Sequence, residues 1–492
     1  VLGVGVNRYA SQPTPISAAG KTVIRSGATL RAGSLLIGGS GQDAVVVESG
    51  AVLDSRGQGQ AGWSAENGFL ISPGADMALL TVSNDRMQFG AASGSGTIRI
   101  EDGAGLYGEG TLALSAPGGL EIGDISLAAS DLLLSMEDIN IGEDAALAAA
   151  EAQGVLSGGW QLNQTTLDGL LALGELESLS LQASDSINFI GSVSLDTYDD
   201  SGESQANLRF IGPAIYGLGD AGDTVTIRTD QFNWSGLGYT SGREGTAEFE
   251  AGSVAPGEVI AGGAGTGTGA FRVEANEVMF GFNGLVGDQS ANATLERLML
   301  GFNDVTFEAQ DRITSDLYGG LSVYQQKNSD DTFSGGNLTL NAPVLTGQAG
   351  SEMAYRTGGN LLVSRPGDAT AVDPADLDLG AQLTLEGNSV RVEGSIIAPS
   401  GKVAIESTDD LLLADGSLIN VAGRAVDFFD VTRYSFGGAV SLESSEGNIQ
   451  QAAGSRIDVS APHSDAGKLE ATAVNGTVDL AGELIARNLE ED

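Results

Sequence analysis

The chain has 492 residues, a formal net charge of −42 and no cysteine. The lack of cysteine excludes a disulfide scaffold and cysteine-ligated metal sites, and the single histidine, His463, excludes a multi-histidine metal site. So large a negative charge opposes binding to nucleic acid and to anionic lipid, so we expect no nucleic-acid partner. No apolar run approaches the roughly 18 residues of a membrane span, and we expect no such span.

We predict that residues 1–100 form the less regular, N-terminal coils of the protein. The chain opens with VLGVGVNRYA, which contains neither an initiator Met nor a basic or cleavable apolar segment. We therefore expect the sequence to be an internal piece, or a processed form, of a longer protein.

Gly38, Gly39, Gly41 and Asp43 fit a glycine-rich calcium-binding nonapeptide. In that motif, tandem turns supply carbonyl and carboxylate oxygens from neighbouring coils. Here the motif stands alone, and a chain with 73 glycines produces single matches by composition. We expect no cofactor, with calcium at these four residues as the alternative.

From residue 100 onward one short phrase recurs, in which apolar and small polar residues alternate before a glycine, Asx or serine corner. A period of two predicts a strand with one buried face. Such strands at irregular spacing favour a stacked solenoid over a β-sandwich or a propeller, whose repeats keep a fixed period. The eleven copies begin at Leu112, Ile125, Leu179, Val225, Phe271, Val305, Leu338, Leu383, Val403, Val440 and Leu469.

Residues 140–175 interrupt the strand pattern. Glu143–Gln153 (EDAALAAAEAQ) consists of strong helix formers, and Thr166–Leu173 predicts a second short helix. We expect both helices to decorate the rod from outside. Gly257–Gly269 contains AGGAGTGTG, which predicts a flexible loop or a bend.

Residues 380–492 predict the most regular coils. Units opening at Gly380, Gly401, Gly438 and Gly467 each hold three short strands, and the surplus residues form loops such as Arg424–Phe436. Three strands per turn describe a parallel β-helix, in which stacking buries a continuous apolar core. We expect a single all-β segment over residues 1–492. In its Val403 strand, Val403 and Ile405 should point inward and Ala404 and Glu406 outward, so that Glu406→Lys changes stability little.

Carboxylates cluster at Asp196–Glu203, Asp330–Asp331 and Asp409–Asp410. Paired carboxylates serve glycosidases as acid and base, so a polysaccharide-cleaving β-helix is the enzymatic alternative. The chain lacks the Gly-His-Gly and Arg-Ile-Lys phrases that one such family, the polygalacturonases, typically shows, and its basic residues are scattered. We expect solvated acidic corners, a solvated loop histidine at His463 and no catalytic residues.

Aromatic residues in the loops are the candidate contact residues for a receptor or a sugar, and the alternative is that they cap the loops against the rod. They are Trp234, Tyr239, Phe428, Phe429 and Tyr434. The chain also has sequons for asparagine glycosylation, which composition alone explains since asparagine, serine and threonine line the corners. The sequons are Asn163, Asn233, Asn292, Asn337 and Asn475.

Three phrases resemble the filamentous haemagglutinin family, the large exoproteins that Gram-negative bacteria export by two-partner secretion. They are GGNLTLNAP at Gly335–Pro343, GSRIDVSAP at Gly454–Pro462 and DRITSDLYGG at Asp311–Gly320. The resemblance covers roughly residues 100–492 and implies a right-handed β-helical fibre, an outer-membrane transporter as partner, and a secreted or cell-surface location. The NPNGI and NPNL motifs of the family's secretion domain are not found in this sequence.

We therefore expect a non-catalytic structural and adhesive segment that contacts a host or neighbouring-cell receptor or glycan. The family's roles are adhesion, biofilm formation and contact-dependent inhibition. Two other classes stay open: a polysaccharide-binding or -cleaving β-helix, and a tailspike-like binding module.

Overall fold

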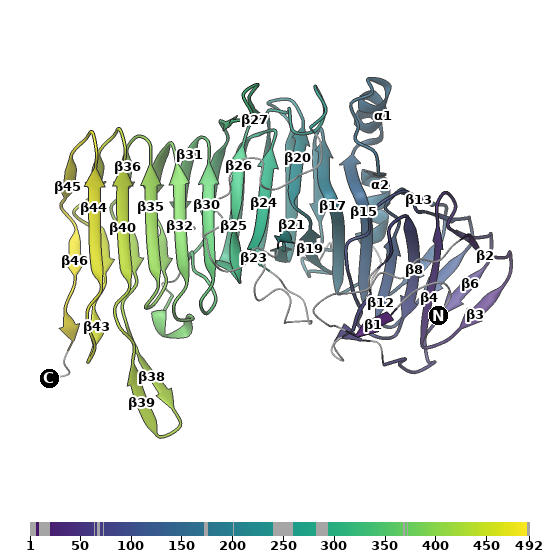
Figure 1. The fold of residues 1–492 in the computed structure, drawn as a ribbon, viewed down its shortest axis with the longest axis horizontal. Helices are drawn as coiled ribbons and strands as arrows, with labels where there is room; N and C mark the ends of the chain where they lie inside the picture. Colours follow the sequence, from purple (N-terminus) through teal and green to yellow (C-terminus); the bar gives the residue numbers. More distant parts are fainter. Residues whose placement is uncertain are drawn as a thin grey trace.

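The computed structural model describes residues 6–8, 20–62, 64–65, 69–71, 73–171, 176–199, 201–239, 259–281, 294–367, 370 and 372–489. Its strands lie side by side along the long axis of an elongated rod (Figure 1). The N-terminal strands occupy one end of the rod and the C-terminal strands the other.

From β17 onward the rod is a parallel β-helix with three sheets, which confirms the predicted all-β solenoid with short helices. Sheet 1 contains β16 (Trp160–Asn163), the second halves of β15 and β17, β20 (Ala214–Leu218), β24 (Thr294–Leu300), β26 (Tyr318–Tyr324), β30 (Glu352–Thr357), β32 (Gln382–Gly387), β35 (Lys402–Ser407), β40 (Ala439–Ser444) and β44 (Lys468–Ala473). Sheet 2 contains β18 (Val193–Asp196), the first parts of β21, β23 and β25, β29 (Asn337–Asn341), β31 (Asn360–Ser364), β33 (Ser389–Val392), β36 (Leu411–Leu413), β41 (Ile449–Gln451) and β45 (Val478–Leu480). The first stretch of sheet 3 contains β4 (Ser34–Ser40), β8 (Met77–Ser83), β12 (Thr111–Ser115), the first halves of β15 and β17, β19 (Asn207–Ile211) and the last parts of β21, β23 and β25. Isolated bridges from Leu345 to Ile313 and Ile396 connect it to the second stretch. The second stretch contains β34 (Ser395–Ile397), β37 (Leu418–Asn420), β42 (Arg456–Asp458) and β46 (Glu483–Ile485).

Five long strands pass from one sheet to the next without a turn. They are β15 (Asp131–Gly142), β17 (Ser178–Ile190), β21 (Thr224–Trp234), β23 (Gly269–Phe280) and β25 (Phe302–Ser315). In the β23–β25 pairing the register shifts between Ala275 and Glu277, and in the β15–β17 pairing between Met136 and Asp138. Such irregularities bend a strand, so here they replace the glycine corners of the C-terminal coils.

Two further parallel sheets build the N-terminal coils together with sheet 3. Sheet 4 contains β2 (Thr22–Ile24), β5 (Val45–Val47), β10 (Thr97–Ile100) and β13 (Gly119–Ile122), and sheet 5 contains β3 (Thr29–Arg31), β6 (Val52–Asp54), β11 (Gly105–Tyr107) and β14 (Ser126–Ala128). In sheet 3, β8 runs antiparallel to both β4 and β12, which interrupts the solenoid pattern in residues 1–100. Strand β22 (Leu237–Tyr239) pairs antiparallel with β24 of sheet 1. The shorter pairings outside these sheets involve β1 (Val6–Arg8), β7 (Phe69–Ile71), β9 (Gln88–Phe89), β27 (Gln326–Lys327), β28 (Phe333–Ser334), β38 (Ala425–Phe428), β39 (Val431–Tyr434), β43 (Ala461–Pro462) and β47 (Asn488–Leu489).

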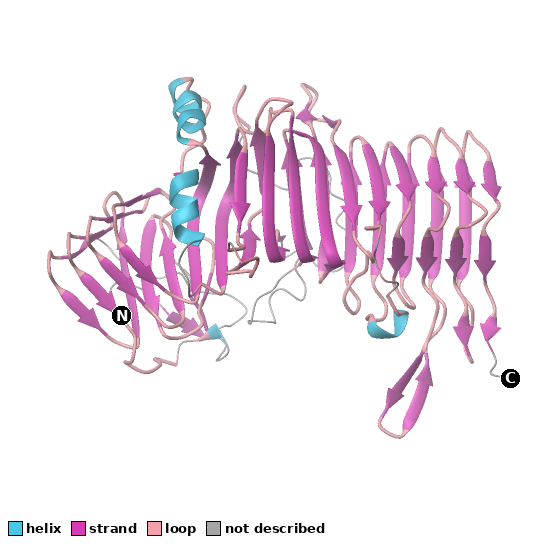
Figure 2. Ribbon diagram, turned by 180° about the vertical axis from the view of Figure 1, so that it is seen from behind, coloured by secondary structure: helices cyan, strands magenta, loops and turns pink. Residues whose placement is uncertain are grey.

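Two of the three walls are interrupted between the N-terminal coils and the rod. Sheets 4 and 5 end at β13 and β14, sheets 1 and 2 begin at β16 and β18, and only sheet 3 continues through β12, β15 and β17. Helix α2 (Gln164–Leu171) lies at this junction (Figure 2). Its leucines Leu167, Leu170 and Leu171 belong to the main core cluster. The expectation that α2 decorates the rod from outside is therefore wrong: it fills the core where the strands stop.

Helix α1 (Asp144–Ala152) covers the outer face of sheet 1. Leu147 and Ala150 are its buried residues, and they pack in an apolar cluster with Ile190, Tyr216 and Leu298. Residues 259–268, within the predicted loop, pack onto the same cluster, and a Cβ at Gly267 would lie 2.7 Å from the Gly219 nitrogen. This part of the loop is a close-packed cover.

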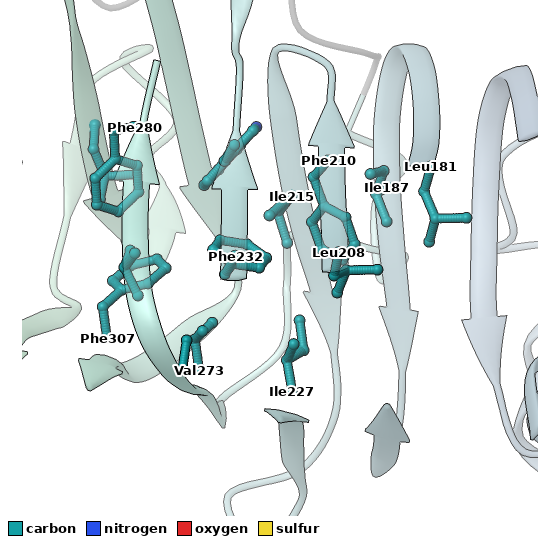
Figure 3. Packing of buried hydrophobic residues seen from close by; sticks show 14 of the residues in the cluster. Leu181, Ile187, Leu208, Phe210, Ile215, Ile227, Phe232, Val273, Phe280 and Phe307 are labelled. Atoms are coloured by element: carbon teal, nitrogen blue, oxygen red, sulfur yellow. The ribbon is translucent and has the colours of Figure 1, made fainter. Parts of the chain in front are cut away.

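The core is one continuous cluster of inward-facing apolar side chains that runs from Ile24 to Val459. Its middle is built from phenylalanines (Figure 3), for example Phe280 and Phe307, whose ring centroids lie 5.0 Å apart in an edge-to-face arrangement. Burying each large apolar side chain stabilises the rod by roughly 1.5–3 kcal/mol. Long strands and large rings occur together here, in β21, β23 and β25.

The predicted register of the Val403 strand is correct. Val403 and Ile405 are fully buried in the core, and Glu406 is exposed. Ala404 lies outside the core cluster, as expected, but it is only 5% exposed. Its methyl group is short, and its register partners Thr384 and Ser441 flank it on the adjacent strands.

Three glutamates stack on the outer face of sheet 1. Glu406 lies in register with Glu386 on one side and Glu443 on the other, and adjacent strands are about 4.8 Å apart. Arg356 forms an ion pair with the first of them, with its Nε 3.3 Å from a Glu386 carboxylate oxygen, whereas Lys402 and Arg356 offset the repulsion at Glu406 only in part. Partial desolvation, followed by repulsion from Glu386 and Glu443, raises the pKa of Glu406. The carboxylate of Glu406 is thus held between like charges.

We therefore expect Glu406→Lys to stabilise the protein, in contrast to the sequence-based expectation of little change. Like charges directly opposite one another destabilise a sheet, so replacing the central one should contribute about 0.5–1 kcal/mol at low salt. Urea denaturation at low and high salt measures the gain, which screening should reduce. Glu406→Gln is the matched control, and its urea midpoint should lie between those of the wild type and Glu406→Lys. Equal midpoints for all three proteins would contradict the argument.

The last coil exposes side chains that point inward in the preceding coils. Val478 and Leu484 are in register with the buried Ile449 and Ile457 but are themselves exposed. This end of the described rod therefore has an open apolar face.

Among the described residues, neither helix is long and apolar enough to cross a membrane.

Candidate functional site

A β-hairpin, β38–β39, projects from the rod between the coils of β37 and β40 (Figure 1). Arg424 anchors its base: its guanidinium donates to the backbone carbonyls of Ala375 and Leu377, beside the short 3₁₀ helix Pro374–Asp376. The Arg424 amide also donates to the hydroxyl of Ser435 at 2.8 Å, on the opposite side of the hairpin base. The base is therefore fixed to the rod while the tip extends away from it.

The tip of the hairpin is a two-residue turn formed by Phe429 and Asp430, because Phe428 pairs directly with Val431. Phe429 has a φ of +54° and a fully exposed side chain. A positive φ at this turn position favours glycine and costs a bulky residue about 1–2 kcal/mol. The ring buries nothing that would offset this cost, and such strain points to a role outside folding.

Three further rings lie near the base of the hairpin. Tyr434 and Phe436 are 43% and 61% exposed. His463, from the loop of the next coil, lies against Tyr434 with ring centroids 4.7 Å apart. We call these exposed rings, Phe429, Tyr434, Phe436 and His463, the aromatic patch; Tyr434 and His463 are in ring contact, and Phe429 lies apart from them at the tip of the hairpin. Exposed groups of large apolar side chains mark interaction surfaces, so this patch is the candidate contact site.

The five aromatic residues predicted to contact a partner differ in their exposure in the structure. Phe429 and Tyr434 are exposed as expected. Trp234 is not a surface residue: it is fully buried at the end of β21, and its indole nitrogen donates to the Gly212 carbonyl at 3.0 Å. Tyr239 lies in β22 and Phe428 in β38, and the side chains of both lie outside the described residues.

Sequence reasoning missed two members of the patch. Phe436 ends the loop 424–436, and His463 was expected to be a solvated loop residue. Both loops are insertions at corresponding places of successive coils, and successive coils are about 4.8 Å apart. That spacing was the available signal that the two insertions meet.

The glycine-rich motif at residues 38–43 has structural roles. Gly39 pairs with Ala78 across the β4–β8 ladder, and Gly41 has a φ of +76°, which favours glycine. The Asp43 carboxylate lies 3.5 Å from both the Lys21 ammonium and the Arg99 guanidinium. Two cations therefore neighbour the carboxylate that the calcium alternative requires. The described residues contain no group of three or more His, Cys, Asp or Glu arranged to hold a metal ion.

The carboxylates of the acidic clusters accept hydrogen bonds at the corners between strands. The Ser201 hydroxyl donates to Asp199 at 2.7 Å, and this hydrogen bond is the main reason why the pKa of Asp199 is lowered. The Thr332 hydroxyl likewise donates to Asp330 and lowers its pKa. In Asp409–Asp410 both carboxylates accept hydrogen bonds from asparagines of adjacent coils. Asp199 and Asp330 also accept from the backbone amides two residues on, those of Ser201 and Thr332, which is the pattern of an Asx turn.

Two of the sequons have clear structural roles. Asn233 is 5% exposed and donates its amide to the Met279 carbonyl, so the fold leaves it no room for a glycan. The side chain of Asn163 accepts from the Thr166 amide and caps α2. Asn337 and Asn475 lie at the surface, and Asn292 lies outside the described residues.

No protein-family model, curated protein or solved structure matches the chain. The solenoid is therefore assigned from the strand pairing alone, and the site from the geometry of the hairpin.

Proposed function

We propose that this chain is a non-catalytic structural and adhesive segment of a secreted bacterial surface fibre of the filamentous haemagglutinin type. In this proposal the stacked coils supply length and stiffness, and an outer-membrane transporter exports the fibre. The role lies in adhesion, biofilm formation or contact-dependent inhibition.

The projecting hairpin carries the proposal. A fibre that contacts a cell needs a group that extends beyond the flat sheet faces, and Phe429 is such a group at the tip of an anchored arm. Its strained backbone and fully exposed ring are explained by contact with a partner.

The rings of the aromatic patch suit two kinds of partner. Exposed aromatic faces pack on the apolar faces of sugar rings, and they also insert into apolar pockets of proteins. Both fit the expected receptor or glycan on a host or neighbouring cell.

Phe429→Gly separates adhesion from folding. Glycine removes the ring and also relieves the positive φ, so the variant should fold at least as stably as the wild type. We expect it to lose at least tenfold in retention of the labelled protein on bacterial and epithelial cell layers and on a glycan array. Flow cytometry and array fluorescence measure this retention.

Leu480→Ser is the matched control, since it removes an exposed apolar side chain from the open end of the rod. It should bind like the wild type if the hairpin makes the contact. If Phe429→Gly binds as well as the wild type, the hairpin is not the adhesive element and the proposal fails.

A further inference from the structure

The interruption of the solenoid leaves two strand edges facing one groove. The last strand of sheet 4, β13, and the first strand of sheet 1, β16, line the same groove of about 660 Å³, together with Thr166 of α2. Within the described residues, β13 pairs only with β10, and β16 pairs only with β15. The groove thus lies where further strands would continue one wall of the rod.

Among the described residues, no backbone group pairs with β13 on its groove side. The Gly123 amide donates to the Ile100 carbonyl at 2.8 Å, so this residue faces β10. Along a parallel strand the residues face its two neighbours alternately. Leu120 and Ile122 therefore direct their amides and carbonyls away from β10 and into the groove.

The side chains around the groove form an inner and an outer row. Leu120 and Trp160 are buried members of the core cluster, and Ile122 packs against that cluster. Glu121 and Gln161, which alternate with them, are exposed. A strand added here would place every second side chain against the apolar row and the others beside the polar row.

The charges at the outer row are mostly negative. Glu101, Asp102 and Glu121 line the groove with one cation, Arg99, whose guanidinium is paired with Glu101 at 2.6 Å and faces Asp43 at 3.5 Å. The groove therefore favours positive charge on the outward side chains of an added strand.

We propose that this groove binds an extended segment of a partner polypeptide in which apolar and basic residues alternate. The segment adds a strand alongside β13, and its backbone pairs with Leu120 and Ile122. Its apolar side chains contact Leu120, Ile122 and Trp160, and its basic side chains face Glu101 and Glu121. This is recognition by β-strand addition, in which backbone bonds supply affinity and alternate side chains supply specificity. It is independent of the aromatic patch.

A fluorescein-labelled octapeptide of alternating valine and lysine, blocked at both ends, is the probe. Its affinity for the full chain is measured by fluorescence anisotropy. Ile122→Pro removes one amide that faces the groove and leaves the bonds to β10 in place, a position at which an edge strand tolerates proline. Ile122→Ala is the matched control for the lost side chain. We expect Ile122→Pro to bind at least tenfold more weakly than Ile122→Ala.

Hydrogen exchange on the wild type gives a second measurement that depends on no variant. Bound peptide should slow exchange at the amides of Leu120 and Ile122, whereas the Gly123 amide is protected in both states. An isomeric peptide with four valines followed by four lysines controls for general attraction to the acidic chain. Equal binding of both peptides, or protection confined to β45 and β46 at the open end of the rod, would overturn the proposal.

Discussion

Ile405→Asp should be among the most destabilising single changes in the C-terminal coils. Ile405 is fully buried, between its register partners Leu385 and Leu442, and the described structure places no cation in that part of the core. The substitution removes an apolar side chain and buries a carboxyl group without a partner, which costs about 4 kcal/mol or more.

The effect should also be local. Each coil of a solenoid contacts only its neighbours, so loss of packing at β35 weakens β32 and β40 most. Hydrogen exchange should show faster exchange in these three strands and unchanged exchange in β23 and β25. Ile405→Val controls for lost volume and should cost roughly 1 kcal/mol. If Ile405→Asp leaves exchange in β35 unchanged, the side chain does not point into the core.

The solenoid was predictable because its signal is periodic. The alternation at Val403 and Val440 sets both the strand and its inward face, and the structure places Val403, Ile405, Val440 and Leu442 in the core. A one-residue error would have reversed every assignment. The helix formers of α1 gave an equally local signal.

Long-range features were not predictable from these patterns. Trp234 looked like a loop residue because its strand, β21, runs straight from one sheet into the next, without the glycine corner that marks the other turns. Helix α2 looked like a decoration because its leucines do not reveal that two walls of the rod stop beside it. Both depend on contacts between residues far apart in the chain.

Only part of the candidate site was predictable from the sequence. Phe429 and Tyr434 stood out as aromatic residues in an inserted loop. The strain at Phe429 depends on the two-residue turn and on its positive φ, which only the structure gives. The groove beside β13 contains no sequence motif at all, since it is formed by strand edges.

A row of polar side chains lies on the outer face of sheet 1, beside the loop that follows α1. Asp138 on β15 is 9% exposed, and the Ser186 hydroxyl lies 2.8 Å from one of its carboxylate oxygens. The same hydroxyl lies 2.9 Å from the side-chain oxygen of Asn188. A hydroxyl has one proton, so it cannot donate to both acceptors at once. A proton on Asp138 resolves this conflict, because Asp138 then donates to Ser186 and Ser186 donates to Asn188.

Burial raises the pKa of Asp138 to about 6 from its usual 3.8, and repulsion from Asp185 and Glu137 adds to the effect. Tyr216 also faces this group, and burial together with the charge of Asp138 raises its pKa as well. Below pH 3.8 Asp138 is protonated in both the folded and the unfolded chain and costs no stability. Between pH 4 and 6 the unfolded chain loses this proton first, so the folded state becomes less stable as the pH rises.

Asp138→Asn should therefore stabilise the protein at pH 7.5 by on the order of 3 kcal/mol and leave it unchanged near pH 4. The asparagine amide donates to Ser186 as the protonated acid does, so the hydrogen-bonded row is kept at every pH. Urea denaturation at pH 4, 6 and 7.5, with hydrogen exchange in β15 and β17, measures the difference. Asp185→Asn is the comparison: it removes the neighbouring charge and a less deeply buried carboxylate, whose own pKa burial also raises, and it should give a smaller gain. A gain for Asp138→Asn that is equal at pH 4 and pH 7.5 would show that the buried carboxylate is not its source.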